Sequence, residues 1–157
     1  MASRLKWVFL LYRLPRTPST PRITLWRSLR RLGVVQLADG LVALPLDART
    51  KEQLEWAAER VLEAGGEAGV WLGQPGTRKL ERDVAARMAA AVAEDYRAVM
   101  EEAVAAAAED EVARRRIVAR LRRELARIAR RDHFPPPERD RARAAVGELA
   151  QTCEAAT

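Results

Sequence analysis

Residues Lys6–Leu46 read KWVFLLYRLPRTPSTPRITLWRSLRRLGVVQLADGLVALPL, and this stretch decides the fold. Its first segment, Lys6–Leu14, is rich in β-branched, aromatic and other apolar residues and therefore predicts a strand. Two short strands are predicted further on, at Val34–Ala38 and Leu41–Leu46, and they meet at Asp39-Gly40, which is typical of a tight hairpin. A basic helix fills the space between the first strand and this hairpin.

That first helix is predicted to run to about Leu32. Thr20 can cap it, Pro21 suits its first position, and Gly33 stops it. Its apolar residues recur at spacings near three, and we expect this face to be buried: Ile23, Trp26, Leu29 and Leu32.

A second helix and a fourth strand follow the hairpin. Thr50-Lys51-Glu52-Gln53 has the pattern of a capping box. The apolar stripe of this helix comprises Leu54, Ala57, Ala58, Val61 and Leu62. Gly65-Gly66 ends it, and Ala68–Leu72 predicts a strand closed by Pro75-Gly76. The order strand, helix, strand, strand, helix, strand is that of an α+β, ferredoxin-like βαββαβ sandwich, which we place at residues 5–75.

Both faces of the first strand are apolar, so we expect both to be covered. The two helices would cover one face, and the C-terminal helices or a second subunit would cover the other. We also interpret all four tryptophans as core anchors: Trp7, Trp26, Trp56 and Trp71.

The C-terminal half is predicted to be helical throughout. Between residues 77 and 134 there is no Gly or Pro, and Ala is abundant. One helix of that length would be far above the usual size, so we expect two, with a turn near Glu109-Asp110-Glu111. Pro135-Pro136-Pro137 breaks the chain before a last helix at about Glu138–Cys153. The helical extension, of two or three helices, is placed at residues 77–155.

Charge is distributed unevenly along the chain. The net charge is +6, and no acid precedes Asp39. Eight basic residues come before it: Arg4, Lys6, Arg13, Arg16, Arg22, Arg27, Arg30 and Arg31. A surface of one sign on a rigid support attracts phosphates and other oxyanions. The chain has only three lysines against 25 arginines, so the placement of the arginines means more than their number.

The first helix carries the main candidate site. Arg27 and Arg31 lie one turn apart, with Arg30 beside them, and guanidinium groups so close repel each other unless an anion lies opposite. We interpret these three as contacts to DNA phosphates, with Arg13 and Arg22 at the rim. The alternative is a solvated helix face that pairs with Glu55 or Glu59.

The start of this helix suggests a further candidate. Arg13, Arg16 and Arg22 could hold an oxyanion through guanidinium forks and backbone N–H groups. Solubility charges in a loop, or additional phosphate contacts, are the alternative interpretation.

A second basic stretch, Ala113–Arg131, holds nine arginines and one acid, Glu124. Its apolar stripe comprises Ile117, Leu121, Leu125 and Ile128. The preceding segment is acidic, so the simplest interpretation is two helices of opposite charge packed side by side. The alternative is that this stretch extends the anion-binding surface.

Little in the sequence indicates catalysis. His133 and Cys153 are too isolated to form a metal site or a nucleophile–base pair, and Asp132–Pro135 is better explained as the cap of a helix end. We therefore expect no enzymatic activity, no catalytic residue, no metal and no cofactor. A single cysteine and the lack of a long apolar run predict a cytoplasmic protein without a membrane span.

Several segments resemble the N-terminal domain of ChrB, a chromate-resistance regulator family, from about residue 6 to residue 150. They are Trp7–Pro15, Leu25–Gly33, Thr50–Trp56, Gly65–Ala68, Glu94–Tyr96 and Asp132–Pro135 with Pro137. The resemblance implies a transcriptional regulator that binds operator DNA, controls a chromate efflux operon and takes chromate as its signal. A homodimer would suit a palindromic operator.

The ferredoxin-like part also resembles the central domain of PaaX-type repressors and the small nucleases of CRISPR adaptation. Those nucleases hold a metal with an Asp directly after the tyrosine of their first strand, whereas Arg13 follows Tyr12 here. Metal-dependent cleavage is therefore disfavoured.

Two alternatives to a DNA-binding regulator remain. One is an oxyanion-sensing or adaptor protein that binds chromate or a partner regulator without DNA, and the other is a structural helical module. Larger members of the ChrB family carry a second domain, so a separate sensor is also an open alternative.

Overall fold

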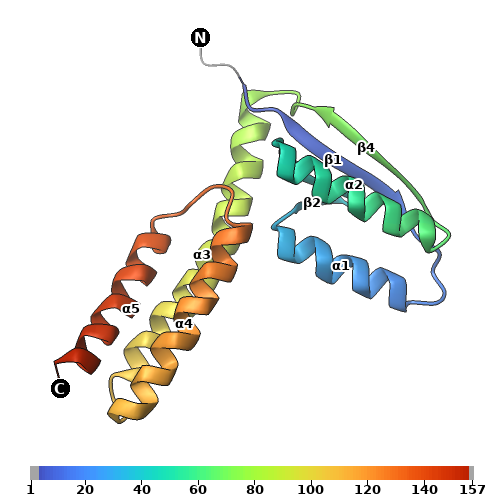
Figure 1. Ribbon diagram of the computed structural model, residues 1–157. Coiled ribbons are helices and arrows are strands. Elements are labelled where there is room, and N and C mark those ends of the chain that lie inside the picture. Colours follow the sequence, from blue (N-terminus) through green and yellow to red (C-terminus); the bar gives the residue numbers. More distant parts are fainter. Residues whose placement is uncertain (1–3, 156–157) are drawn as a thin grey trace. The chain divides into compact units, whose positions relative to one another are not determined.

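The computed structural model describes residues 4–155, in which there are four strands and five helices (Figure 1). They are β1 (Trp7–Arg13), α1 (Thr20–Leu32), β2 (Val35–Ala38), β3 (Leu41–Pro45), α2 (Ala48–Glu63), β4 (Glu67–Gly73), α3 (Arg78–Ala106), α4 (Glu111–Arg131) and α5 (Glu138–Glu154). The chain divides into two compact units, Met1–Arg87 and Met88–Thr157. The division falls within α3, about three helical turns beyond the composition change at Gly76.

The first unit is built on a four-stranded antiparallel sheet with the order β2-β3-β1-β4. β1 is central and pairs with both β3 and β4, so that Leu10 lies opposite Val42 on one side and Val70 on the other. α1 and α2 lie together on one face of this sheet (Figure 1). The predicted strands and helices of this half therefore occur in the expected sequence order.

The hairpin between β2 and β3 turns at Asp39-Gly40, as the sequence predicted. Gly40 has a φ of 77°, and a Cβ added there would collide with the Tyr12 carbonyl oxygen. The Tyr12 backbone N–H also donates to the Gly40 carbonyl, with 2.8 Å between the nitrogen and oxygen atoms. The hairpin tip is thus held against the end of β1, and only glycine fits there.

Both predicted helix starts were slightly misplaced. α2 begins at Ala48, with Asp47 as its N-cap: the Asp47 carboxylate accepts from the Thr50 N–H at 2.7 Å, and Thr50 Oγ1 accepts from the Asp47 N–H at 2.9 Å. Thr50 therefore completes a capping box from its third position. The Thr50 N–H bond also lowers the pKa of Asp47. In α1 the N-cap is Ser19 rather than Thr20, and its side chain makes no capping hydrogen bond.

The core of the first unit shows which face of α1 is buried. Leu25 and Leu29 are buried, whereas Ile23 is 50% exposed and Trp26 only partly buried. The prediction that Ile23 and Trp26 lie on the core face was therefore wrong. The side of α1 that packs on the sheet carries Leu25 and Leu29, which are four residues apart. The prediction had followed residues three apart.

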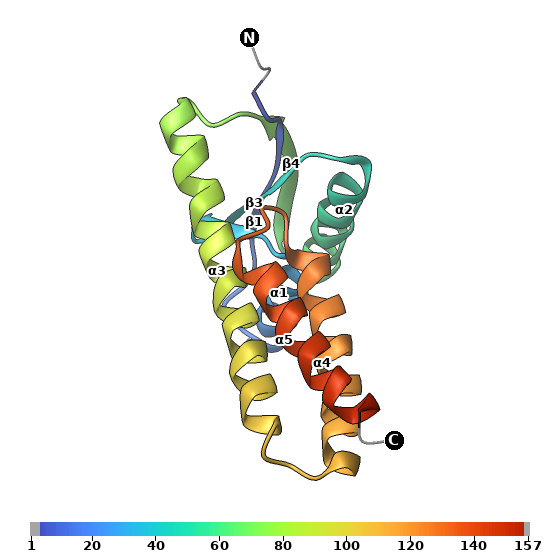
Figure 2. The ribbon, with the colours of Figure 1, turned by 90° about the vertical axis from the view of Figure 1, so that its left-hand side faces the viewer.

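The tryptophans differ in burial. Trp7 is buried, and its indole N–H donates to Glu81 Oε1 at 3.0 Å, so the first turns of α3 lie on the face of the sheet opposite α1 and α2 (Figure 2). Trp56 and Trp71 are 61% and 62% exposed, which makes the core-anchor prediction wrong for both. The second sheet face is thus covered near Trp7, while Leu11 and Trp71 remain exposed.

The second unit contains the rest of α3 together with α4 and α5. Asp110 caps α4 by accepting from the Ala113 N–H at 2.9 Å, which confirms the predicted turn near Glu109–Glu111. α5 follows the proline break, also as predicted. The core of this unit comprises Val92, Tyr96, Val99, Ala103, Ala106, Val118, Leu121, Ile128, Ala142, Val146 and Leu149.

Polar contacts join α3 to α4 and its cap. Arg120 pairs with Glu102 at 2.6 Å, and Arg131 pairs with Asp95 at 3.0 Å, in agreement with two helices of opposite charge. The buried Tyr96 hydroxyl donates to Oδ2 of Asp132, the α4 C-cap, at 2.8 Å. Burial and this bond raise the pKa of Tyr96 well above its ordinary value, so the hydroxyl remains a donor.

Replacing Tyr96 with Phe should lower the free energy of unfolding by about 1–3 kcal/mol, because Asp132 loses a buried donor. Urea titration of the full chain measures this loss. In a double-mutant cycle, Tyr96→Phe should cost less when Asp132 is already Asn. Equal losses in both backgrounds would contradict a direct coupling.

Glycine substitutions should separate backbone strain from collision. Gly65→Ala should lower the free energy of unfolding by about 1–2 kcal/mol, because the φ of Gly65 is 82°. No collision adds to this loss, since nothing lies within 4 Å of an added Cβ. Gly40→Ala should cost more, because strain and the Tyr12 carbonyl act together. Gly76→Ala, which has neither problem, is the control. In thermal unfolding, Gly40→Ala should lose the most stability, Gly65→Ala less and Gly76→Ala the least. Equal losses for Gly40→Ala and Gly65→Ala would rule out the collision.

Candidate anion-binding recess

The first unit has a recess of about 750 Å³ formed by the end of β1, one side of α1 and the β2–β3 turn. Four arginines line it: Arg13, Arg22, Arg27 and Arg30. The other lining residues include Tyr12, Ile23, Trp26 and Asp39. We call this the arginine recess. It gathers four of the five arginines predicted to contact DNA.

Helix geometry explains why α1 supplies three of these arginines. Arg22, Trp26 and Arg30 follow each other at intervals of four residues, and Ile23 and Arg27 form the adjoining row. The adjoining side of α1 is fixed against the sheet by the buried Leu25 and Leu29. Arg13 enters from the last residue of β1, so two elements present guanidinium groups to the same space.

These four guanidinium groups are not neutralised by carboxylates. Within residues 4–155 none of them forms an ion pair. Asp39 is the one acid in the recess lining. The alternative pairing with α2 is not found among the described residues: Glu55 pairs with Lys51 at 3.5 Å, and no ion pair joins Glu59 to α1. The recess therefore carries excess positive charge that an anion can compensate.

Tyr12 adds a neutral hydrogen-bond donor to the recess. Burial raises its pKa above the ordinary value of 10.0, the positive charge of Arg22 opposes this rise, and the negative charge of Asp39 adds to it. The phenol consequently stays protonated at neutral pH. A hydroxyl donor among guanidinium forks is chemically suited to phosphate or oxyanion oxygens.

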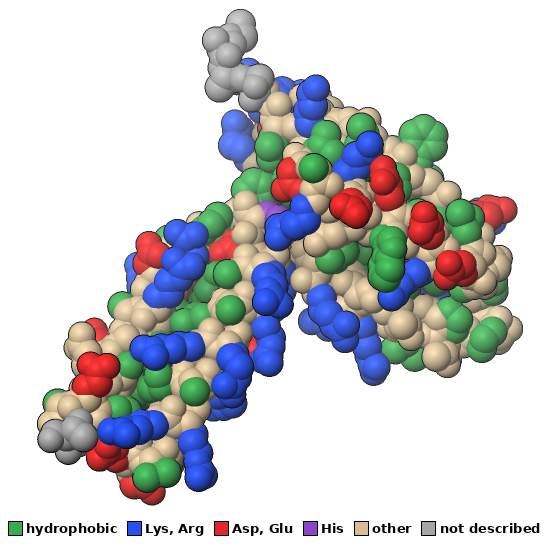
Figure 3. Space-filling view, in the orientation of Figure 1, with side chains coloured by type: hydrophobic (Ala, Val, Ile, Leu, Met, Phe, Trp, Pro, Cys, Tyr) green, Lys and Arg blue, Asp and Glu red, His purple; other side chains and the backbone are tan. Residues whose placement is uncertain are grey.

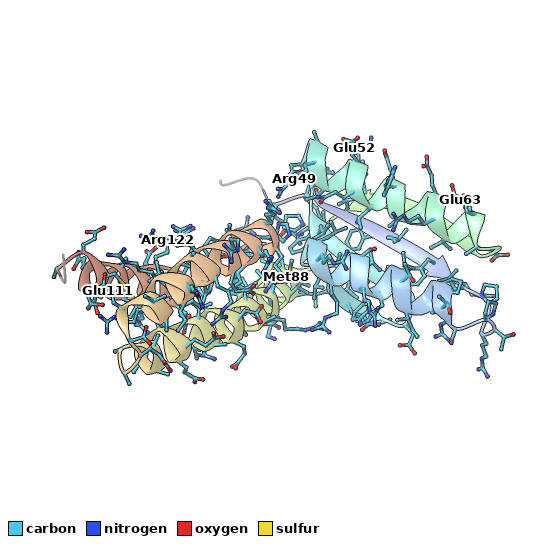
Figure 4. All side chains as sticks on the ribbon, turned by 60° about the horizontal axis from the view of Figure 1, so that its bottom comes forward. Arg49, Glu52, Glu63, Met88, Glu111 and Arg122 are labelled. Carbon is cyan, nitrogen blue, oxygen red and sulfur yellow. The ribbon has the colours of Figure 1, made fainter. Side chains whose placement is uncertain are left out.

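The two remaining predicted arginines lie elsewhere. Arg16 does not line the recess, so the predicted oxyanion trio is reduced there to Arg13 and Arg22. Arg31 lines a second groove of about 480 Å³ between α1 and α2, together with Arg49, Trp56 and Arg60. Figure 4 shows Arg49 at the start of α2. The Arg60 guanidinium stacks 4.5 Å from the centre of the Trp56 ring.

The arginines of α4 are partly compensated. Besides the two pairs with α3, Arg115 pairs with Glu111 at 2.6 Å and Arg127 with Glu124 at 3.0 Å. Basic side chains recur along this unit in Figure 3, and Arg122 extends from α4 in Figure 4. This pattern favours the packing of opposite charges over a second anion site.

The sequence interpretation missed the apolar and uncharged members of the recess. Trp26 and Ile23 had been placed in the core, and Tyr12 had been treated only as a strand residue. The spacing of residues 22, 23, 26, 27 and 30 on one helix side was the signal that could have found the first two. Only the fold brings Tyr12 and Asp39 to that side.

Residues 4–155 contain no group of three or more His, Cys, Asp or Glu side chains that could hold a metal ion. In the same range no helix combines the length and the apolar character needed to cross a membrane.

Comparison with known proteins gives one match. Residues 22–157 match the family model described as "Protein ChrB, N-terminal". The matched region begins at the third residue of α1 and includes every later element, whereas β1 precedes it. Searches of curated proteins and of solved structures gave no significant match.

The pKa of Tyr12 should report on the charges of the recess. Arg22→Ala should raise it further by removing a positive charge that favours the phenolate, and Asp39→Asn should lower it. A phosphate ion bound in the recess should also raise it. NMR titration of isotope-labelled tyrosine measures each shift. A fall in pKa on Arg22→Ala would disprove this arrangement.

Proposed function

Because the chain belongs to the ChrB N-terminal family and is thus related to chromate resistance, we propose that it is a DNA-binding transcriptional regulator of a chromate efflux operon. The arginine recess is the observation that carries this proposal. Its guanidinium groups lie on a rigid helix and on a strand end, and they have no carboxylate partners among the described residues. This is the chemistry of a phosphate-contacting surface.

The size of the recess favours a nucleic acid backbone over a single small anion. At about 750 Å³ it has room for more than one tetrahedral anion. Successive phosphates of a DNA strand can be contacted by guanidinium groups spaced along a helix. Arg22, Arg27 and Arg30 would make these contacts from α1, with Arg13 at the rim; Arg31, on the other groove, would contribute less.

An oxyanion sensor that does not bind DNA is the second candidate. One part of the recess favours this second candidate. The charge of Arg22 acts on the pKa of Tyr12, so a guanidinium group and a hydroxyl group lie near each other there, and such donors together suit a chromate ion. In the regulator, chromate bound beside Arg22 and Tyr12 would act as an effector that competes with a DNA phosphate.

Other parts of the proposal concern the fold and the assembly. The sheet order β2-β3-β1-β4, with α1 and α2 on one face, supports a ferredoxin-like assignment of the first unit. We expect the regulator to act in the cytoplasm as a homodimer, without a cofactor or enzymatic activity. The resemblance to PaaX-type repressors stays a prediction.

Fluorescence anisotropy with DNA from the gene's upstream region tests the proposal. Arg27→Ala/Arg30→Ala should weaken binding and reduce the slope of log affinity against log salt by about 2, because two phosphate contacts are lost. The control, Arg31→Ala/Arg49→Ala, removes the same charge from the other groove and should have a smaller effect. Circular dichroism checks that both variants fold.

The other outcomes are equally informative. Binding that Arg27→Ala/Arg30→Ala leaves unchanged at moderate salt would show that the recess is not the DNA surface. Chromate that releases DNA, where equal sulfate does not, would identify the protein as its own sensor. Absence of DNA binding at low salt, together with chromate binding, would establish the oxyanion sensor instead.

A further inference from the structure

The two edges of the sheet differ in how well they are protected. β2, at one edge, is only four residues long, and its pairing with β3 shifts register between Gln36 and Ala38. The outward carbonyl of Gln36 is also occupied, because Arg87 Nη2 donates to it at 2.8 Å. A short, irregular and capped edge resists pairing with another strand.

β4, at the other edge, has none of these protections. It is seven residues long, pairs with β1 without a register shift, and contains no Lys or Pro. The Tyr12 N–H bond to Gly40 shows that the even-numbered residues of β1 bond to β3, so its odd-numbered residues bond to β4. Ala68, Val70 and Leu72 therefore present their backbone N–H and C=O groups outward, away from β1.

The side chains of β4 are also unusual for a strand at a sheet edge. Trp71 and Leu72 are 62% and 56% exposed and lie on opposite faces of the sheet. The two residues before Val70, Ala68 and Gly69, are small. The Trp71 indole already lies near Gly69 of its own strand. Two small residues thus precede Val70 and two large apolar residues follow it.

We propose that β4 is the homodimer interface, pairing antiparallel with β4 of a second copy around a two-fold axis at Val70. This register is the one symmetric pairing that overlaps all seven residues of the strand. The outward groups of Ala68, Val70 and Leu72 then bond to those of Leu72, Val70 and Ala68 in the second copy. Two four-stranded sheets become one continuous sheet.

Self-pairing suits the side chains as well as the backbone. In this register Leu72 lies opposite Ala68 of the second copy and Trp71 opposite Gly69, so each large apolar residue meets a small one. Glu67 lies opposite Gly73, so the two carboxylates do not face each other. α2 packs on β1 and β4, so its copies are brought side by side, and Leu62 on it is 55% exposed.

This inference names the surface for the homodimer of the proposed function, but it rests on the edge itself and not on DNA binding. Its test therefore contains no DNA. A protein that dimerises through β4 and ignores DNA would refute the regulator alone, whereas a monomer that binds DNA would refute the interface alone.

Sedimentation equilibrium of the full chain tests the interface. Val70→Pro removes an outward N–H and leaves the β1 bonds intact, so it should raise the dissociation constant of the dimer at least about tenfold. Gln36→Pro makes the matching change at the β2 edge and should leave the dimer unchanged. A wild-type protein that stays monomeric at high micromolar concentration, or a dimer indifferent to Val70→Pro, overturns the proposal.

Cysteine cross-linking tests the register of β4 against β4 of the second copy. This test does not require the proline variant to fold. In a Cys153→Ala background, Val70→Cys should cross-link to itself under a short thiol-reactive linker. Ala68→Cys and Leu72→Cys should cross-link in a mixture much more efficiently than either does alone. Equal cross-linking of all three alone would mean that the strands are not paired in this register, and the proposal would fail.

Discussion

The central position of β1 is the constraint on which the first unit depends. Hydrogen bonds to β3 and β4 on its two sides fix the direction of every side chain along it. Val8 and Leu10 point into the layer formed with α1 and α2, while Trp7 points to the first turns of α3. At the end of the strand the same alternation turns Tyr12, like Val8 and Leu10, toward the side of α1, and Arg13 lines the recess from the last position of β1.

Local signals in the sequence were sufficient for the order of the elements. Glycines, prolines and the Asp39-Gly40 turn mark the breaks, because backbone conformation is decided within a few residues. The misplaced start of α2 shows the limit of this reasoning. Asp47 and Thr50 form a reciprocal pair whose members both look like caps, and only the hydrogen bonds show which residue begins the helix.

Burial was harder to predict than secondary structure. α1 carries apolar residues on two adjoining sides, and the sequence does not reveal which side packs on the sheet. The prediction therefore placed Ile23 and Trp26 on the buried side and left out Leu25. Trp56 and Trp71 were placed in the core because large aromatic residues are usually buried. Helix spacing was only a partial guide to the arginines: Arg22 and Arg30 line the same recess, whereas Arg27 and Arg31, four residues apart, line different grooves. Their predicted contact with DNA stays a prediction.

The composition of the recess limits how the cell could switch it. Acetylation of lysine is a common way to remove positive charge from a surface that binds nucleic acid. No lysine is among the residues that line the recess, and the three lysines of the chain are Lys6, Lys51 and Lys79. Guanidinium groups keep their charge at every physiological pH. Control by lysine acetylation therefore has no target among the residues that line the recess.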